Sequence, residues 1–118
     1  MKKRIVHFEI GCADMPATAE FYQKIFDWDI SPQGSSATIN TGGQGAIPGH
    51  INQLTPKEPQ QYVTVYIETD TLEEDLKAVA AHGGKQLTPA ITLPDGRTFA
   101  WFQDVAGNTV GLITPNLT

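Results

Sequence analysis

The sequence contains little cysteine and no long apolar run. Cys12 is the only cysteine in 118 residues, so no disulfide can form within the chain, and a single thiol is typical of a reducing compartment. No segment approaches the roughly 18 consecutive apolar residues that a membrane-spanning helix needs. The first residues pass from Lys2-Lys3-Arg4 into an alternating pattern without the apolar core of a signal peptide. We therefore expect a cytoplasmic protein with no membrane contact.

Basic residues are scarce as well. The chain has 8 Lys and Arg against 13 Asp and Glu, which gives a net charge of −5. Nucleic-acid binding draws its affinity from clustered cations, and the only basic cluster lies at residues 2–4, where short charge runs are usually solvated. We therefore expect no nucleic-acid partner. The length indicates one domain.

The first half of the chain begins with a predicted strand at residues 5–10. Hydrophobic and polar residues alternate there, so that Phe8 and Ile10 point to one face and His7 and Glu9 to the other. A period of two with β-branched and aromatic residues is typical of a half-buried strand.

A helix is predicted to follow this strand. Asp14 has the position of an N-cap, and apolar residues then recur at helical spacing as far as about Phe26. Short strands are predicted at residues 28–30 and 35–41, with a weaker candidate at 45–53.

The pattern restarts after a polar linker at residues 55–60, which contains two prolines. A strand is predicted at 62–67, and then a helix with Thr71 as N-cap. Glu74 would complete a capping box with Thr71, and Gly83 would end the helix in the left-handed conformation. Three more strands are predicted after it: 85–93 with an interruption at Pro89, 99–103 and 109–114.

The two halves repeat one another. At one constant offset Val6 falls on Val63 and the helix cap Asp14 falls on Thr71. The phase of the strand and the position of the cap coincide, which indicates an internal duplication. We predict an α+β fold of two tandem βαβββ modules. The boundaries are a single domain over 1–118, with repeat units at about 4–54 and 61–115 and the linker at about 55–60.

The helix of each module must cover an apolar face of its sheet. The residues assigned to that face are Val6, Phe8, Ile10, Val63, Val65, Ile67, Phe102, Val110 and Leu112. The opposite face combines aromatic and polar groups, which is the usual lining of a small-molecule pocket. Its residues include His7, Glu9, Tyr62, Thr64, Tyr66, Phe99, Trp101 and Gly111. Alternatively, this face is solvated or packs against a second subunit.

Individual residues of this open face have candidate roles. His7, with an ordinary pKa of about 6.5, can contact a ligand or act as an acid–base group, or it is a structural histidine bonded to Glu9 or to a neighbouring strand. Glu9 is a candidate pocket carboxylate and, with His7, a candidate catalytic group. Phe99 and Trp101 can stack on a planar ligand.

Several short motifs stand in a characteristic order. They are His7, Asp14, Ala19-Glu20-Phe21-Tyr22, Phe26-Asp27-Trp28, Ala80-Ala81-His82-Gly83-Gly84 and the ending from Phe102 through Gly107-Asn108 to Leu112. On these motifs the chain resembles the vicinal oxygen chelate superfamily, which contains glyoxalase I, bleomycin-resistance proteins and extradiol dioxygenases. The resemblance implies paired modules that form a cupped mixed sheet with the helices on its outer face, completed as a homodimer.

The resemblance also implies a set of metal-ligand positions. Metalloenzymes of this superfamily take one ligand from each of four strands, and the metal polarises substrate oxygens as a Lewis acid. The corresponding positions here are His7, Thr64 and Gly111, and His50 is the only residue near the fourth that could coordinate. Threonine is a poor ligand and glycine offers none, whereas a catalytic divalent site normally needs three protein ligands. We therefore expect no cofactor; if a metal binds, His7 and His50 would hold it.

Three functions stay open at this point. The first is a small-molecule-binding protein of the glyoxalase and bleomycin-resistance type without the full catalytic metal site. The second is an enzyme of the superfamily, lyase-like or dioxygenase-like, which depends on a metal or uses His7 and Glu9 as acid and base. The third is an interaction module whose sheet is filled by its partner.

Overall fold

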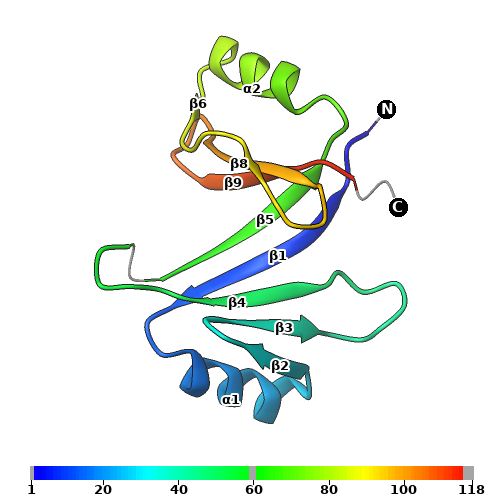
Figure 1. Cartoon of the computed structure of the whole chain (residues 1–118), viewed down its shortest axis with the longest axis vertical. Coiled ribbons are helices and arrows are strands. Elements are labelled where there is room, and N and C mark those ends of the chain that lie inside the picture. The colour runs from blue at the N-terminus through cyan, green and yellow to red at the C-terminus, as the bar shows by residue number, and fades with distance from the viewer. Residues whose placement is uncertain (1, 59–60, 116–118) are drawn as a thin grey trace. The chain divides into compact units, whose positions relative to one another are not determined.

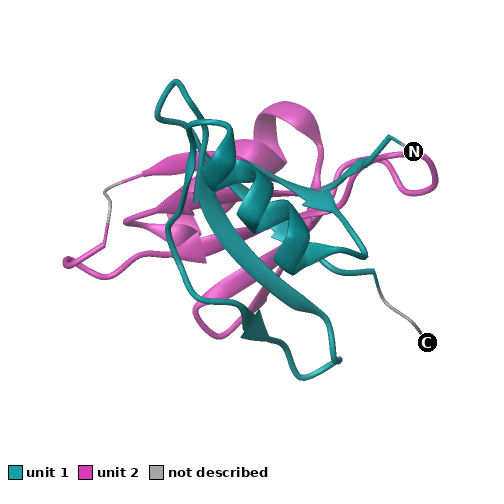
Figure 2. Ribbon diagram, turned by 90° about the horizontal axis from the view of Figure 1, so that it is seen from above, with its two compact units in different colours: residues 1–6, 65–118 teal, residues 7–64 magenta. Residues whose placement is uncertain are grey.

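The computed structural model describes residues 2–58 and 61–115, so residues 59 and 60 of the expected linker lie outside it. The chain divides into two compact units, which Figure 2 shows in different colours. We call residues 7–64 the N-terminal unit, and residues 1–6 with 65–118 the C-terminal unit. The strands β1 (Ile5–Cys12) and β5 (Tyr62–Glu68) each contribute residues to both units.

The N-terminal unit consists of helix α1, strands β1 to β4 and the first residues of β5. After β1 come α1 (Met15–Phe26), β2 (Asp29–Gln33), β3 (Ser36–Asn40) and β4 (Gly49–Gln53). The strand order is β2-β3-β4-β1 (Figure 1), with β1 parallel to β4 and the other pairs antiparallel. In this parallel pair Glu9 stands opposite His50 and Gly11 opposite Asn52.

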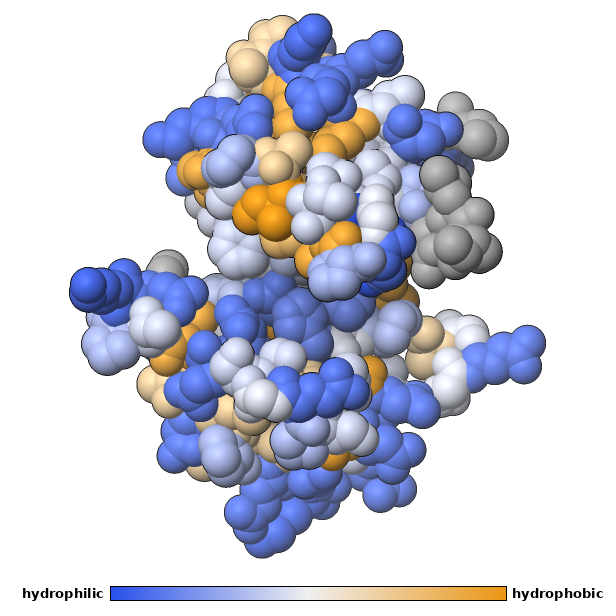
Figure 3. Space-filling model, in the orientation of Figure 1, coloured by the Kyte–Doolittle hydropathy of each residue, from blue (hydrophilic) through white to orange (hydrophobic). Residues whose placement is uncertain are grey.

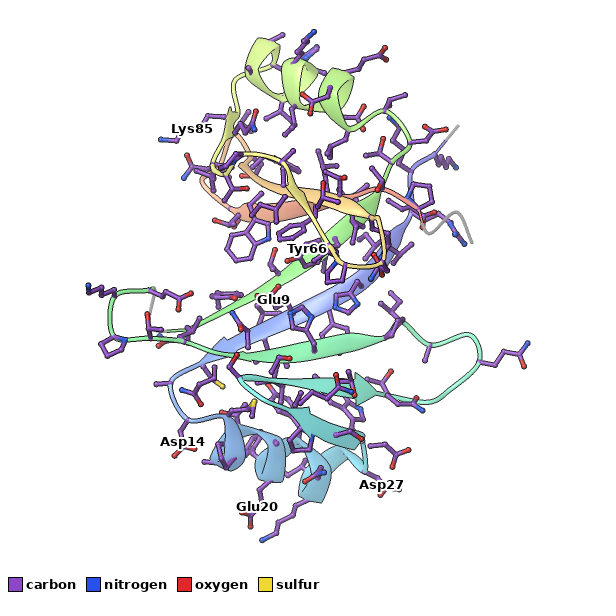
Figure 4. The ribbon with its side chains drawn as sticks, in the orientation of Figure 1. Glu9, Asp14, Glu20, Asp27, Tyr66 and Lys85 are labelled. Atoms are coloured by element: carbon purple, nitrogen blue, oxygen red, sulfur yellow. The ribbon has the colours of Figure 1, made fainter. Side chains whose placement is uncertain are left out.

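Helix α1 has the boundaries that its sequence predicts. The Asp14 side chain accepts a hydrogen bond of 3.0 Å from the backbone N–H of Ala17, which is an N-cap interaction. At the other end Asp27 adopts the left-handed conformation with φ 59°, and its N–H donates to the carbonyl of Gln23. Both residues are labelled at the ends of α1 in Figure 4.

One face of the N-terminal unit is apolar and packs against α1. Its buried members are Ile10, Cys12, Met15, Ala19, Ile30, Ala37, Ile39 and Ile51, with Phe8, Tyr22 and Trp28 packed beside them. Gly49 makes room for this packing, because a Cβ there would lie 2.5 Å from the Phe8 ring. The assignment of Phe8 and Ile10 to the helix-covered face is confirmed. By strand alternation His7 and Glu9 point to the other face.

The C-terminal unit repeats this arrangement around a second helix. After β5 come α2 (Leu72–Ala81), β6 (Lys85–Gln86), β7 (Ile91–Thr92), β8 (Thr98–Gln103) and β9 (Thr109–Ile113). The strand order is β5-β9-β8-β6 with β7 also on β8, and β5 runs parallel to β9. The expected strand at 85–93 is two short pieces on either side of Pro89, because proline cannot donate to a ladder. Each unit mixes parallel and antiparallel pairs, so the predicted α+β class with mixed pairing is confirmed.

Helix α2 confirms both predicted boundaries, with Thr71 at the N-cap position, but it lacks the predicted capping interaction. The predicted capping box is wrong, because Thr71 makes no capping hydrogen bond to the helix backbone. Its hydroxyl instead lies 2.9 Å from Nζ of Lys3 and 3.2 Å from Oδ1 of Asp75, which compete for it. At the other end Gly83 has φ 98° and the N–H of Gly84 donates to the carbonyl of Val79, as in a Schellman motif. Neither described helix is long and apolar enough to cross a bilayer.

The core of the C-terminal unit packs against α2. It consists of Leu72, Leu76, Ala100 and Leu112, with Ile67 and Phe102 beside them. The predicted positions of Ile67, Phe102 and Leu112 are therefore confirmed. Val63 is a correction: alternation predicts it on the helix-covered face, but its side chain is 71% exposed. It precedes residue 65, where β5 enters the unit that contains α2.

Candidate functional site

Three predicted site residues of the N-terminal unit come together on the face opposite α1. The parallel register of β1 and β4 sets Glu9 beside His50. Nε2 of His7 lies 2.6 Å from Nδ1 of His50, and Nε2 of His50 lies 3.2 Å from Oε1 of Glu9. The imidazole of His50 therefore bridges His7 and Glu9 through its two ring nitrogens. We call these three residues the histidine relay.

The Glu9 carboxylate is held at both oxygens. It is 3% exposed, and Figure 4 shows it on β1. A buried carboxylate is costly unless hydrogen bonds replace its water. Here the Tyr62 hydroxyl donates to Oε2 while His50 faces Oε1, and the amide of Asn52 lies 3.3 Å from the Tyr62 oxygen. Tyr62 and Asn52 thus extend the hydrogen bonds of the histidine relay beyond Glu9, and we call the five residues together the relay network.

A glycine gives Tyr62 its place. The Tyr62 ring lies over Gly11, where a Cβ would collide with the ring atoms. Burial raises the pKa of the Tyr62 phenol well above its usual range, and the hydrogen bond to Glu9 raises it further. Tyr62 therefore stays a protonated donor to Glu9 at neutral pH.

The relay constrains where protons can sit. A carboxylate only accepts hydrogen bonds, so with Glu9 ionised the contact to His50 requires a proton on Nε2 of His50. With His50 neutral, its Nδ1 is an acceptor, and His7 donates its Nε2–H to it. In this arrangement Nδ1 of His7 carries the ring's lone pair, so it is the nitrogen that can take up a proton.

The donor set does not fit the metal site that the resemblance implies. Among the residues that the structure describes, no three His, Cys, Asp or Glu side chains are arranged to hold a metal ion. Both ring nitrogens of His50 already face partners, and the remaining positions of the family pattern are Thr64 and Gly111. The N-terminal unit therefore offers a hydrogen-bonded relay rather than three converging ligands.

The predicted aromatic residues come together in the C-terminal unit. The indole Nε1–H of Trp101 donates to the Tyr66 hydroxyl over 2.8 Å, and the Phe99 ring meets Tyr66 edge-on with centroids 6.2 Å apart. Tyr66, labelled in Figure 4, stands opposite Gly111 in the β5–β9 pair. A Cβ on Gly111 would collide with the Tyr66 ring. The Tyr66 ring thus covers the place where the family pattern has a ligand side chain.

A surface cavity of about 550 Å³ lies elsewhere in the C-terminal unit, at the start of α2. It is lined by Lys2, Lys3, Arg4, Glu68, Thr69, Asp70, Thr71 and Pro115. Its lining includes both cations and carboxylates, and Lys3 is paired with Asp75 at 2.7 Å. None of the residues predicted for the site lines this cavity.

Sequence reasoning missed two residues of the relay network. Alternation predicts Tyr62 on the open face without a role in the site, and Asn52 is not among the predicted site residues. The alternation of β4 carried a usable signal, because Asn52 lies two residues after His50 and so shares its face. Gly11, two residues after Glu9, was a further sign that a large ring crosses β1 there.

Comparison with known proteins places these features in a family. The sequence profile of the Glyoxalase/Bleomycin resistance protein/Dioxygenase superfamily matches residues 4–112. A glyoxylase-like domain-containing protein from Didymella fabae is 28% identical over 93% of this chain and 96% of its own length.

Solved structures resemble the chain at lower identity. A hypothetical protein from Bacillus halodurans superposes with a TM-score of 0.75 at 12% identity, covering 100% of this chain and 98% of its own. A methylmalonyl-CoA epimerase from Streptomyces coelicolor, in complex with 2-nitronate-propionyl-CoA, superposes with a TM-score of 0.69 at 18% identity. The match covers 100% of this chain and 98% of the epimerase chain. At such identities these structures establish the fold alone.

Proposed function

Because the chain belongs to the Glyoxalase/Bleomycin resistance protein/Dioxygenase superfamily, we propose that it binds a small molecule and transfers a proton to or from it, with His7 as the acid–base group. The observation that carries this proposal is the unbroken contact from His7 through His50 to the buried Glu9. A base oriented by a second group, which is itself oriented by a carboxylate, is a recurring arrangement in acid–base catalysis.

The proton transfer balances within the relay. Nδ1 of His7 takes a proton from the bound molecule, and the electron pair of the broken bond stays on that molecule. The Nε2 proton of His7 can then pass to Nδ1 of His50, which makes His50 an imidazolium beside the Glu9 carboxylate. The reverse sequence returns the proton. Glu9 stabilises the positive charge at each stage without being protonated itself.

The chemistry of a structural neighbour agrees with this proposal. A methylmalonyl-CoA epimerase is by its name an epimerase, and epimerisation of a carbon beside a carbonyl group amounts to removal and return of a proton. We extend only this reaction class to the present chain, as a proposal. The substrate expected is a carbon acid, that is, a molecule whose C–H bond is acidified by a neighbouring carbonyl.

Hydrogen–deuterium exchange tests the proposal. The protein is incubated in D₂O with a panel of carbon acids that includes methylmalonyl-CoA, and deuterium uptake at carbon is followed by mass spectrometry. We expect uptake to fall by a factor of about 10² to 10⁴ in His7→Ala, the usual contribution of a general acid–base group. His82→Ala is the control, since His82 lies at the end of α2 and bonds to the carbonyl of Ala78. Equal uptake in wild type and His7→Ala would refute the proposal.

A second candidate function is binding without catalysis. It is supported by the half-buried rings of Phe99 and Trp101, which are held beside the buried Tyr66 in the C-terminal unit and can stack on a planar ligand. Binding to the folded state stabilises it by RT ln(1 + [L]/Kd), which raises the melting temperature. A compound from the panel that stabilises wild type but not Trp101→Ala, and that takes up no deuterium, would favour this function.

The proposal includes three expectations about the working protein. We propose that it acts without a resident metal, as a homodimer, in the cytoplasm. Metal analysis of protein purified without chelator tests the first, and a stoichiometric metal lost in His7→Ala would overturn it. Sedimentation tests the second, and microscopy of the tagged protein in its native cell tests the third.

A further inference from the structure

The position of Tyr62 relative to the relay settles the direction of its hydrogen bonds. Its oxygen lies 3.3 Å from Nδ2 of Asn52, and an amide nitrogen can only donate. The phenol therefore accepts from Asn52 and directs its own hydrogen elsewhere. An acceptor at hydrogen-bond distance is Oε2 of Glu9. The Tyr62 hydroxyl thus accepts a hydrogen bond from Asn52 and donates one to Glu9.

The backbone holds Tyr62 in this place. Gly11 lies under its ring, and Gly11 is the β1 partner of Asn52 in the β1–β4 pair. The ring therefore crosses β1 directly beside the amide that binds its hydroxyl. Glu9 stands one step along the same face, two residues before Gly11. Both contacts of the hydroxyl follow from the strand register.

We propose that Tyr62 is a positioning residue of the proposed acid–base site. By binding Oε2 of Glu9 it turns Oε1 toward His50, and the carboxylate then holds the His50 proton on Nε2. His50 must accept from His7 through Nδ1, which leaves Nδ1 of His7 as the basic nitrogen. This inference rests on the proposed function for its chemical meaning, but it concerns a proton arrangement that can be measured without a substrate.

Nitrogen NMR of the imidazole rings at one fixed pH near neutrality tests the proposal, because ring ¹⁵N shifts report which nitrogen carries the proton. The chain has three histidines, of which His82 lies at the end of α2 and serves as the internal reference. In wild type we expect His50 as the Nε2–H tautomer and His7 protonated on Nε2. In Tyr62→Phe, which keeps the ring over Gly11 but removes the hydroxyl, the His50 tautomer ratio should fall roughly tenfold, the effect of losing one hydrogen bond to a charged group.

A matched variant separates positioning from general loss of structure. Tyr22→Phe removes a hydroxyl from a tyrosine whose ring stacks on Trp28 in the core, and it should leave all three imidazoles as in wild type. Unchanged His7 and His50 signals in a folded Tyr62→Phe would overturn the proposal. If Tyr62→Phe does not fold, the wild-type spectrum decides alone, since an Nδ1–H tautomer of His50 contradicts it.

Failure of the proposed function has a different signature. If deuterium uptake is the same in wild type and His7→Ala while the His50 tautomer still responds to Tyr62→Phe, the acid–base function fails and the positioning role of Tyr62 stands. If uptake depends on His7 but the tautomer does not respond, Tyr62 has no positioning role and the function stands.

Discussion

In the N-terminal unit the parallel strands β1 and β4 set Glu9 beside His50, and in the C-terminal unit the parallel strands β5 and β9 set Tyr66 beside Gly111. The two pairs occupy corresponding places in the two βαβββ modules. One place holds a buried carboxylate against an imidazole. The other holds a tyrosine ring against bare backbone.

The difference shows how one scaffold supports two kinds of surface. A charged side chain such as Glu9 needs partners at both of its oxygens, so the N-terminal unit assembles a chain of hydrogen bonds around it. An aromatic ring such as Tyr66 needs packing area and one partner for its hydroxyl, and Gly111 and Trp101 supply these. Hydrophobic residues also lie at the surface of the C-terminal unit around β6 to β8 (Figure 3), where Leu87 and Ile91 are exposed.

Each unit contains a tyrosine ring that lies over a glycine. Adding a side chain at that glycine should have the largest effect on stability. A Cβ at Gly11 would displace the Tyr62 ring, and a Cβ at Gly111 would displace the Tyr66 ring. We expect Gly11→Ala and Gly111→Ala each to lower the free energy of unfolding by about 2–3 kcal/mol, the upper part of the usual cost of overpacking. Urea denaturation measures this loss.

Two readouts make this prediction sharper. Gly42→Ala is the control, since the nearest atom to its Cβ would be 3.5 Å away, and its effect should stay within about 0.5 kcal/mol. Only Gly11→Ala should also change the ring-nitrogen spectrum of His50. If Gly111→Ala changed that spectrum equally, the separation of the two chemistries between the units would be wrong.

The next largest effect comes from removing one hydroxyl in each unit. The Tyr62 hydroxyl donates to a buried carboxylate, whereas the Tyr66 hydroxyl accepts from a neutral indole N–H. Hydrogen bonds to charged groups contribute more, so we expect Tyr62→Phe to cost about 2 kcal/mol and Tyr66→Phe about 1 kcal/mol. Denaturation of both variants in parallel measures the order. A larger loss in Tyr66→Phe would contradict it.

Much of this architecture could be predicted from local patterns. Alternation separated Phe8 and Ile10 from His7 and Glu9, because burial on one side of a strand leaves a period of two. The prediction failed where a tertiary contact competes with a local one: Lys3 and Asp75 take the Thr71 hydroxyl away from its capping role.

The relay was only partly visible for a related reason. The opposition of Glu9 and His50 depends on the register of β1 against β4, and the sequence around residues 45–53 marks that strand weakly. His50 was therefore reached through a resemblance rather than through a pattern. The link through Tyr62 spans two strands that are distant in sequence, and no local signal sets such a contact.

Alkaline pH should weaken the N-terminal unit through Tyr62. Its pKa lies above the ordinary value of 10.0 because burial and the hydrogen bond to Glu9 disfavour the phenolate. The stability that the neutral Tyr62 phenol contributes is fully present below pH 10.0, where the phenol is neutral in both the folded and the unfolded protein. This contribution is lost as pH rises from there toward the pKa of the folded state. The free energy of unfolding should therefore decline above about pH 10 less steeply in Tyr62→Phe than in wild type. The free energy of unfolding of wild type and Tyr62→Phe is measured by denaturation from about pH 9 to about 11.5, with phenolate absorbance as the monitor of ionisation. Equal slopes of this free energy against pH in the two proteins would contradict the prediction.

Acid should have the smallest effect, and it should act on the C-terminal unit through Asp75. Burial raises the pKa of Asp75, but hydrogen bonds from Lys3, Thr69 and Thr71 outweigh it and hold the pKa below its ordinary 3.8. The stabilisation is therefore present above pH 3.8 and is lost as pH falls through the folded-state value. Because the partly exposed pair with Lys3 is screened by solvent, we expect Asp75→Asn to cost less than about 1 kcal/mol at neutral pH.

The ion pair of α1 in the N-terminal unit is the matched control for that change. Lys24 and Glu20 lie 2.5 Å apart, but both side chains are mostly in solvent, so Glu20→Gln should leave urea denaturation unchanged at neutral pH. The Lys3–Asp75 pair differs because it also ties the beginning of the chain to Thr71 at the start of α2. Equal midpoints for Asp75→Asn and Glu20→Gln would show that this tie contributes no more stability than an exposed pair within one helix.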